Sequence, residues 1–188
     1  MSNQIRKWKA EHADFVRLLS ILESQIGLFH DEAGTNYELM LDIVYYLTQF
    51  PDRFHHPRED IAFGKLAERD PSTQIRVREL LGEHKAIASA GKRLVEQLDG
   101  ILAGAMLERE SVEVDAATYI AYYRQHIVGE ETNLFPRLEG VLGNEDWKAV
   151  DDSITAEADP LFGGKVEQRF QQLHRQIMLA SEGRDTNA

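Results

Sequence analysis

Two short segments of this chain combine imidazole and carboxylate side chains at the same spacing. His55 is followed four positions later by Glu59, and His126 is followed four positions later by Glu130. Each residue of the second pair lies 71 positions after its counterpart in the first pair. On a helix, residues i and i+4 project from one face, so each segment directs a nitrogen donor and an oxygen donor toward one point. Two such pairs facing each other could hold two metal ions.

Two further histidines fall within apolar helical stripes. His12 fills the gap between Trp8 and Phe15, and His84 fills a similar gap before Ile87. A single histidine of this kind is more often a hydrogen-bonded core residue than a ligand. However, four successive helical segments each provide a histidine at the depth of the core, and independent core histidines would not require two glutamates at the same offset. The joint pattern therefore favours a metal site.

His56 has two interpretations. Pro51 and Pro57 each remove a helical hydrogen bond, which predicts a kink or bulge near the histidines. In a regular helix His55 and His56 diverge by about 100°, whereas a bulge could turn both toward the bundle centre. Alternatively, Pro51 opens a separate helix and His56 faces solvent.

Apolar residues recur every three or four positions along most of the chain, which predicts an all-α protein. The long helices are expected at about residues 5–29, 36–68, 73–102 and 113–138. In the third of these, the inward stripe is expected to run from Ile75 through His84 to Leu102. A short helix is expected from Asn144, and a last helix over residues 165–179.

These elements predict an up-down four-helix bundle over residues 1–140. We expect residues 141–181 to form a C-terminal extension of one or two helices packed on the bundle, as a lid or a dimer surface. Residues 182–188 are expected to be a disordered tail.

The composition excludes several classes of protein. The 188 residues are 43% hydrophobic, yet no apolar run approaches the roughly 18 residues of a membrane span, and the N-terminus lacks a signal-peptide layout, so we expect a soluble cytoplasmic protein. The absence of cysteine excludes thiolate zinc sites, cysteine-bound iron–sulfur clusters and thiol catalysis. A net charge of −11 argues against binding to nucleic acid or to a membrane surface.

The motifs resemble those of the HHE cation-binding family, the hemerythrin-like domains. The resemblance covers about residues 5 to 138 and rests on motifs in the family order: His12, His55-His56-Pro57-Arg58-Glu59-Asp60, Glu83-His84, and His126-x-x-x-Glu130-Glu131 followed by Leu134-Phe135-Pro136. It implies an up-down four-helix bundle with a non-haem di-iron centre. The ligands that it implies are His12, His55, Glu59, His84, His126 and Glu130, with Glu59 and Glu130 bridging the metals.

The chain departs from the oxygen-carrying hemerythrins in two places. Ala88 stands where those proteins have a second histidine on the third helix, and the fourth helix carries Glu130 instead of a later aspartate. Both differences argue against reversible oxygen transport. His56 would supply the missing nitrogen ligand.

Two functional classes follow, and they leave open whether the protein is an enzyme. In the first, a centre of two iron ions binds, senses or reacts with O2, NO or peroxide. In the second, the protein holds iron or binds a partner without turnover. Zinc or manganese could replace iron, because nitrogen and oxygen ligands do not select the metal by themselves. A homodimer is a further option for the assembly.

Overall fold

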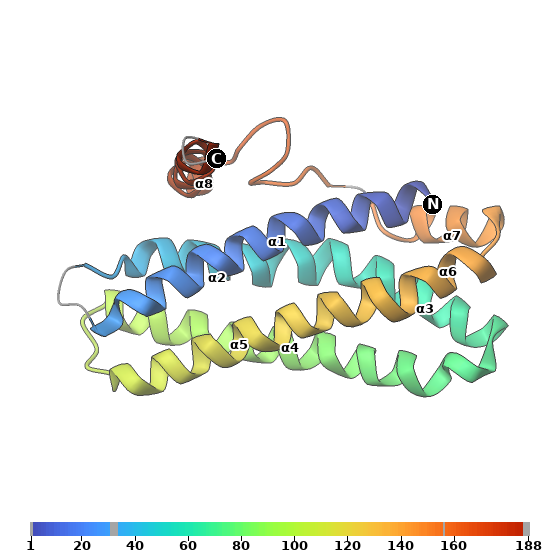
Figure 1. Ribbon diagram of the computed structural model, residues 1–188, viewed down its shortest axis with the longest axis horizontal. Coiled ribbons are helices and arrows are strands. Elements are labelled where there is room, and N and C mark those ends of the chain that lie inside the picture. The colour runs from blue at the N-terminus through green and yellow to red at the C-terminus, as the bar shows by residue number, and fades with distance from the viewer. Residues whose placement is uncertain (1, 31–33, 156, 186–188) are drawn as a thin grey trace.

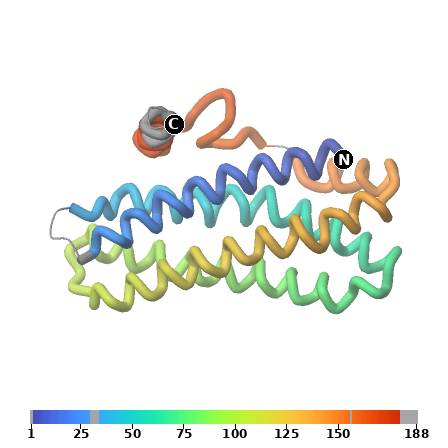
Figure 2. Tube along the Cα trace, viewed as in Figure 1, coloured from blue at the N-terminus to red at the C-terminus, as the bar shows by residue number. Residues whose placement is uncertain are grey.

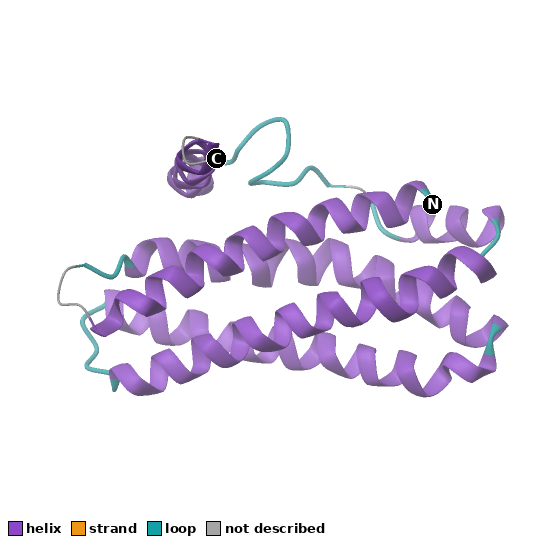
Figure 3. Ribbon diagram, in the orientation of Figure 1, coloured by secondary structure: helices purple, strands orange, loops and turns teal. Residues whose placement is uncertain are grey.

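Four helical rods lie side by side in the computed structural model, which describes residues 2–30, 34–155 and 157–185, with the backbone only for residues 30 and 180–185 (Figure 1). Successive rods run in opposite directions, and each packs on two neighbours (Figure 2). The rods are built from α1 (Asn3–Gly27), α2 (Tyr37–Phe50), α3 (His56–Arg69), α4 (Gln74–Leu102), α5 (Arg109–Gly129) and α6 (Phe135–Val141). The expected all-α bundle is confirmed, and the described residues contain no strand (Figure 3).

Side-chain caps set the starts of the first two rods. The backbone N–H of Ile5 donates to the Ser2 hydroxyl at 3.1 Å, and that of Leu39 donates to Asn36 Oδ1 at 2.9 Å. Each bond satisfies an N–H that the first turn of a helix leaves without a partner. The start predicted near Asn36 is therefore confirmed, whereas the first helix ends at Gly27, before a 3₁₀ turn at Leu28–His30.

A polar layer divides the core into two apolar clusters. On α1, His12 lies between Trp8 of one cluster and Phe15 of the other, and on α4 His84 lies between Leu80 and Ile87 in the same way. All six of these side chains and their neighbours in the layer are buried. The apolar clusters therefore fix the rods on both sides of the layer and hold its polar groups away from water.

The inward stripe of α4 differs from the prediction at both ends. Ile75 is 71% exposed and Leu102 is 44% exposed, whereas Val77 is buried. The reason is register, because a three-four repeat that passes through His84 reaches Val77 and leaves Ile75 on the outer face.

Gly91 marks the closest approach of α4 to its neighbours. A Cβ built at this position would lie 2.4 Å from Thr48 Cγ2 on α2 and 3.1 Å from Tyr119 Cε2 on α5. Since neither distance leaves room for a methyl group, glycine allows the second, third and fourth rods to pack at this level.

The C-terminal segment packs on the bundle at two places. The helix α7 (Asn144–Ser153) is held by Asp146, which accepts hydrogen bonds from the Gly143 N–H at 3.0 Å and from Arg69 Nη2 of α3 at 2.8 Å. Further along, the Tyr46 hydroxyl of α2 donates to Asp159 Oδ2 at 2.8 Å.

The last helix, α8 (Gln171–Asp185), follows a 3₁₀ turn at Gln168–Phe170. It starts later than the predicted residue 165 and extends past residue 179. Residues 186–188 of the predicted tail lie outside the described residues. No helix in the described ranges is long and apolar enough to cross a membrane.

Candidate metal centre

A π-helical turn (η2, Pro51–His55) joins α2 to α3, at the place where the two prolines predicted a bulge. The wider hydrogen-bonded turn of a π-helix is closed here by the backbone N–H of His56, which donates to the Pro51 carbonyl five residues earlier. The extra residue in this turn changes the direction of the side chains that follow. As a result His55 and His56 are both buried, at 0% and 4% exposure. The alternative in which His56 faces solvent is wrong.

A second π-helical turn (η4, Glu130–Leu134) joins α5 to α6. The sequence predicted one continuous helix here, and that prediction is wrong. Pro136 lies in the first turn of α6 and has no N–H to donate. The series of backbone hydrogen bonds along the rod is therefore interrupted at this point. Glu130, the first residue of the turn, is fully buried.

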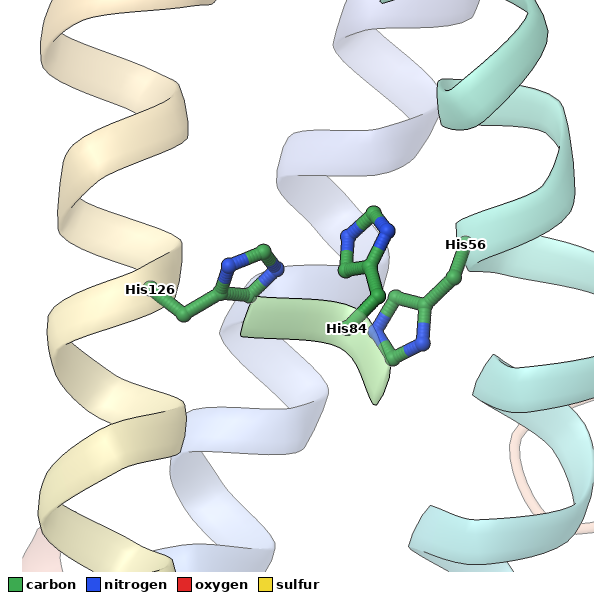
Figure 4. A group of neighbouring side chains, drawn as sticks. All are labelled: His56, His84 and His126. Carbon is green, nitrogen blue, oxygen red and sulfur yellow. The ribbon is translucent and has the colours of Figure 1, made fainter. Parts of the chain in front are cut away.

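The structure brings together all seven side chains that the sequence proposed as ligands. All seven are buried, and together the four rods supply them: His12, His55, His56, Glu59, His84, His126 and Glu130. Figure 4 shows His56, His84 and His126 turned toward one another from α3, α4 and α5. The rings of His56 and His84 are stacked with centroids 4.2 Å apart, and those of His84 and His126 are 4.6 Å apart.

The other two imidazoles meet on the opposite side of the centre. Nε2 of His12 lies 3.0 Å from Nε2 of His55. Phe135 stacks on the His12 ring, and Phe15 packs edge-on against the His55 ring. This side of the centre therefore has apolar walls.

The two buried glutamates lie between the two groups of histidines. The Glu59 carboxylate is 3.2 Å from His55 Nε2 and 3.8 Å from His84 Nε2. The Glu130 carboxylate is 3.3 Å from Nε2 of His12 and 3.3 Å from Nε2 of both His84 and His126. Each carboxylate therefore reaches histidines of both groups.

A second set of carboxylates orients the imidazoles. Every one of the five rings has Nδ1 within 3.0 Å of an acidic oxygen: His12 with Glu131 at 3.0 Å, His55 with Glu11 at 2.6 Å, His56 with Asp52 at 3.0 Å, His84 with Asp60 at 2.6 Å, and His126 with Glu83 at 3.0 Å. A carboxylate can only accept, so in each neutral ring Nδ1 carries the proton and donates it. Nε2 is then a free lone pair directed at the centre, the arrangement usual for histidines that bind metals.

None of these five carboxylates is among the ligands predicted from the sequence. A signal for four of them was present, because each is the immediate neighbour of a proposed ligand. Asp60 and Glu131 also repeat the 71-residue offset.

The charges of the centre shift the pKa values in opposite directions. Burial alone lowers the pKa of His84, but the carboxylates of Asp60 and Glu130 outweigh it and raise that pKa to about 10. Burial raises the pKa of Glu59, yet the facing imidazoles of His55 and His12 hold it well below its usual range. The pKa of His56 is lowered by burial and by repulsion from neighbouring imidazoles, so this ring is neutral.

Several donor atoms at the centre make no hydrogen bond. In the described part of the chain, both oxygens of Glu59, both oxygens of Glu130 and Nε2 of His84 and His126 are buried and accept no hydrogen bond. Leaving buried carboxylates unpaired is costly. Cations placed among these oxygens and nitrogens would satisfy all of them, so the residues fit a metal centre.

Two halves of the bundle build this centre in the same way. The halves share one arrangement of five residues, namely Glu11, His12, His55, Glu59 and Asp60 in the first and Glu83, His84, His126, Glu130 and Glu131 in the second. Glu11 binds His55 as Glu83 binds His126. Across the two halves, His12 binds Glu131 as His84 binds Asp60.

His56 and its partner Asp52 break this symmetry. The positions 71 residues later are occupied by Ile127 and Tyr123, neither of which offers an imidazole. One side of the centre therefore has three histidines and the other has two.

Two surface grooves reach the centre on either side of α5. The groove between α4 and α5 has a volume of about 520 Å³, and His126, Glu83 and Tyr122 are among its walls. The groove between α1 and α5 has a volume of about 360 Å³, and His12 and Val128 are among its walls. Both therefore border a histidine of the centre.

Comparison with known families identifies one match. Residues 3–138 match the family described as the hemerythrin HHE cation binding domain. The matched range runs from the start of α1 to Leu138 in α6, so it spans the four rods. It includes all seven converging side chains. No curated protein matches the chain.

Proposed function

The chain belongs to the hemerythrin HHE cation-binding family, and from that premise we propose that its buried centre holds two iron ions and binds, senses or reacts with O2, NO or peroxide. The observation that carries this proposal is the set of five imidazoles, each with Nδ1 bonded to a separate carboxylate and Nε2 directed inward. A helical protein with such a set is built to bind metal.

The proposed division of ligands follows the two groups of histidines. His56, His84 and His126 would hold one ion, and their donor atoms lie within 4.8 Å of one another. His12 and His55 would hold the other, together with Glu59. Glu130 and Glu59 would bridge the ions, because each carboxylate reaches both groups.

Electrostatics favours two cations over one. Seven carboxylates contact or border the centre, namely Glu11, Asp52, Glu59, Asp60, Glu83, Glu130 and Glu131. Basic side chains compensate for part of this charge on the outside, such as Arg58 beside Glu11 at 3.6 Å and Arg76 beside Glu83 at 2.9 Å. Two divalent cations would offset more of the remaining negative charge than one cation at the buried end, where solvent does not screen charge.

The unequal histidine count indicates where a small ligand would bind. The side with His12 and His55 has one nitrogen donor fewer, and Phe15 and Phe135 shield it with apolar surface. Iron(II), when bound, supplies electrons and an open coordination position for O2, NO or peroxide. The residues of this chain orient the imidazoles, exclude water and accept hydrogen bonds from the Nδ1–H groups.

Metal analysis of protein produced in iron-supplemented medium tests the proposal, followed by an ultraviolet–visible spectrum before and after exposure of the reduced protein to O2 or NO. We expect two irons per chain and a new charge-transfer band. Two bound metals that are spectroscopically inert would support the iron-holding alternative. Zinc or manganese at full occupancy, or less than one metal per chain, would overturn the iron assignment.

A further inference from the structure

The most exposed side chains of α5 carry no charge over four turns. From residue 114 to residue 128, the six most exposed side chains of this helix are all uncharged: Val114, Ala117, Ala121, Tyr122, Gln125 and Val128. We call these six residues the α5 face. Three of them are large and well exposed, with Val114 at 56%, Tyr122 at 55% and Val128 at 58%.

This face is unusual for the chain that carries it. Charged residues make up 28% of the sequence, and the net charge is −11. The inner face of α5 is also apolar, with Ala116, Tyr119 and Tyr123 buried. A helix with apolar side chains on two opposite faces is normally covered on both of them. Among the described residues, those that pack on α5 cover its inner side.

The spacing of the α5 face suits another helix. Val114, Ala117, Ala121 and Val128 follow one another at intervals of three, four and seven, the repeat that places side chains along one seam. Small side chains at Ala117 and Ala121 allow a facing helix to approach closely, while the valines at the two ends add apolar contact area.

The same face is complementary to itself. If a second α5 runs antiparallel with its centre at Ala121, Val114 faces Val128 of the copy, Ala117 faces Gln125, and Ala121 faces its own counterpart. Such a pairing is isologous and closes as a twofold dimer. A strongly acidic chain repels its own copies across most of its surface, and the α5 face is a part of the surface where that repulsion is absent.

Two basic side chains beside the face do not oppose this pairing, because each is paired with a carboxylate of its own chain. Arg124 pairs with Glu23 at 2.8 Å on one flank. Arg76 pairs with Glu83 at 2.9 Å on the other. Figure 1 shows α8 on the side of α1 and α2, where it leaves α5 uncovered.

From these observations we propose that a second copy of this chain docks antiparallel on the α5 face. The interface covers Tyr122 and Val128, which line the grooves that reach His126 and His12. Dimerisation therefore narrows both routes to the centre. The inference does not depend on which metal the centre holds.

A single-cysteine experiment tests the geometry, since the chain has no cysteine of its own. In an Ala121→Cys variant, each thiol lies beside its counterpart on the twofold axis. Diamide takes up the two electrons and two protons of the two thiols, and a disulfide-linked dimer forms. In a Val114→Cys control the two thiols are about 21 Å apart along the helices, so no rapid cross-link is expected. Equal cross-linking of both variants would overturn the antiparallel register.

Sedimentation equilibrium of the full chain tests the interface itself. We expect the wild-type protein to be a dimer of twice the 21.4 kDa chain mass. Ala121→Glu places two carboxylates on the axis and should weaken the dimer at least about tenfold, with an unchanged helical circular dichroism spectrum. Met178→Glu, at an exposed residue of α8, should leave the dimer intact. A monomeric wild type, or dissociation by Met178→Glu but not by Ala121→Glu, would overturn the proposal.

Discussion

Nδ1 of His84 on α4 donates a hydrogen bond to Asp60 Oδ1 on α3 at 2.6 Å. The aspartate is 43% exposed, whereas the imidazole is 6% exposed. A surface carboxylate thus fixes the orientation of a buried ring from a neighbouring rod. The same relation holds between Glu131 and His12 in the other half of the bundle.

Replacement of Asp60 should weaken metal binding without altering the fold. In Asp60→Asn the amide oxygen can still accept from Nδ1, but the negative charge that increases the basicity of the His84 ring is lost. We expect metal affinity to fall by about 10- to 100-fold, measured by competition with a chromophoric chelator. Glu96→Gln is the matched control, because Glu96 is exposed on α4, the helix of His84, about 18 Å further along than His84. Equal affinity of the two variants would show that Asp60 does not act through His84.

Loss of His56 should affect one metal position more than the other. His56→Ala removes one of three imidazoles from its group, while the group with His12 and His55 keeps both. We expect bound metal to fall from two ions toward one per chain at limiting metal concentration, measured by elemental analysis. His174→Ala, at a half-buried residue of α8, should retain full occupancy. Two tightly bound ions in His56→Ala would show that His56 is not a ligand.

Metal binding should release protons near neutral pH. In the metal-free chain the pKa of His84 is raised to about 10, since Asp60 and Glu130 outweigh the effect of burial. The ring is therefore protonated at pH 7, and a metal ion must displace the proton on Nε2. Affinity should rise as the pH increases toward 10, where that proton is lost without metal.

Calorimetric titration in two buffers of different ionisation enthalpy measures the number of protons released. The His84→Ala variant should release fewer protons than the wild-type chain. Binding heats that do not depend on the buffer would contradict this prediction.

Two glycines of α4 should respond oppositely to the same substitution. Gly91→Ala places a methyl group against Thr48 and Tyr119, and we expect a loss of about 1–3 kcal/mol in the free energy of unfolding. Gly82→Ala meets no described atom within 4 Å, so it should be neutral or gain up to about 1 kcal/mol from helix propensity. Urea denaturation of both variants measures the difference. A Gly91→Ala protein as stable as Gly82→Ala would show that the rods do not pack as closely as described.

The sequence by itself determined which side chains can form the centre and how many rods carry them. Helical periodicity specified the buried faces, and the His-x-x-x-Glu spacing paired a nitrogen and an oxygen donor on each of two faces. Both signals are local, because they depend only on residues one or two turns apart. They could therefore be interpreted before any tertiary contact was known.

Only the tertiary structure decided the direction of His56 and the partners of the five Nδ1 atoms. Pro51 opens the π-helical turn before His56 and Pro57 follows it, and this local sequence left two directions open for the His56 side chain. The bonds from His12 to Glu131 and from His84 to Asp60 join different rods, over 119 and 24 residues of chain. No spacing along one helix specifies such contacts, since they depend on how the apolar clusters on each side of the polar layer set the rotation of every rod about its axis.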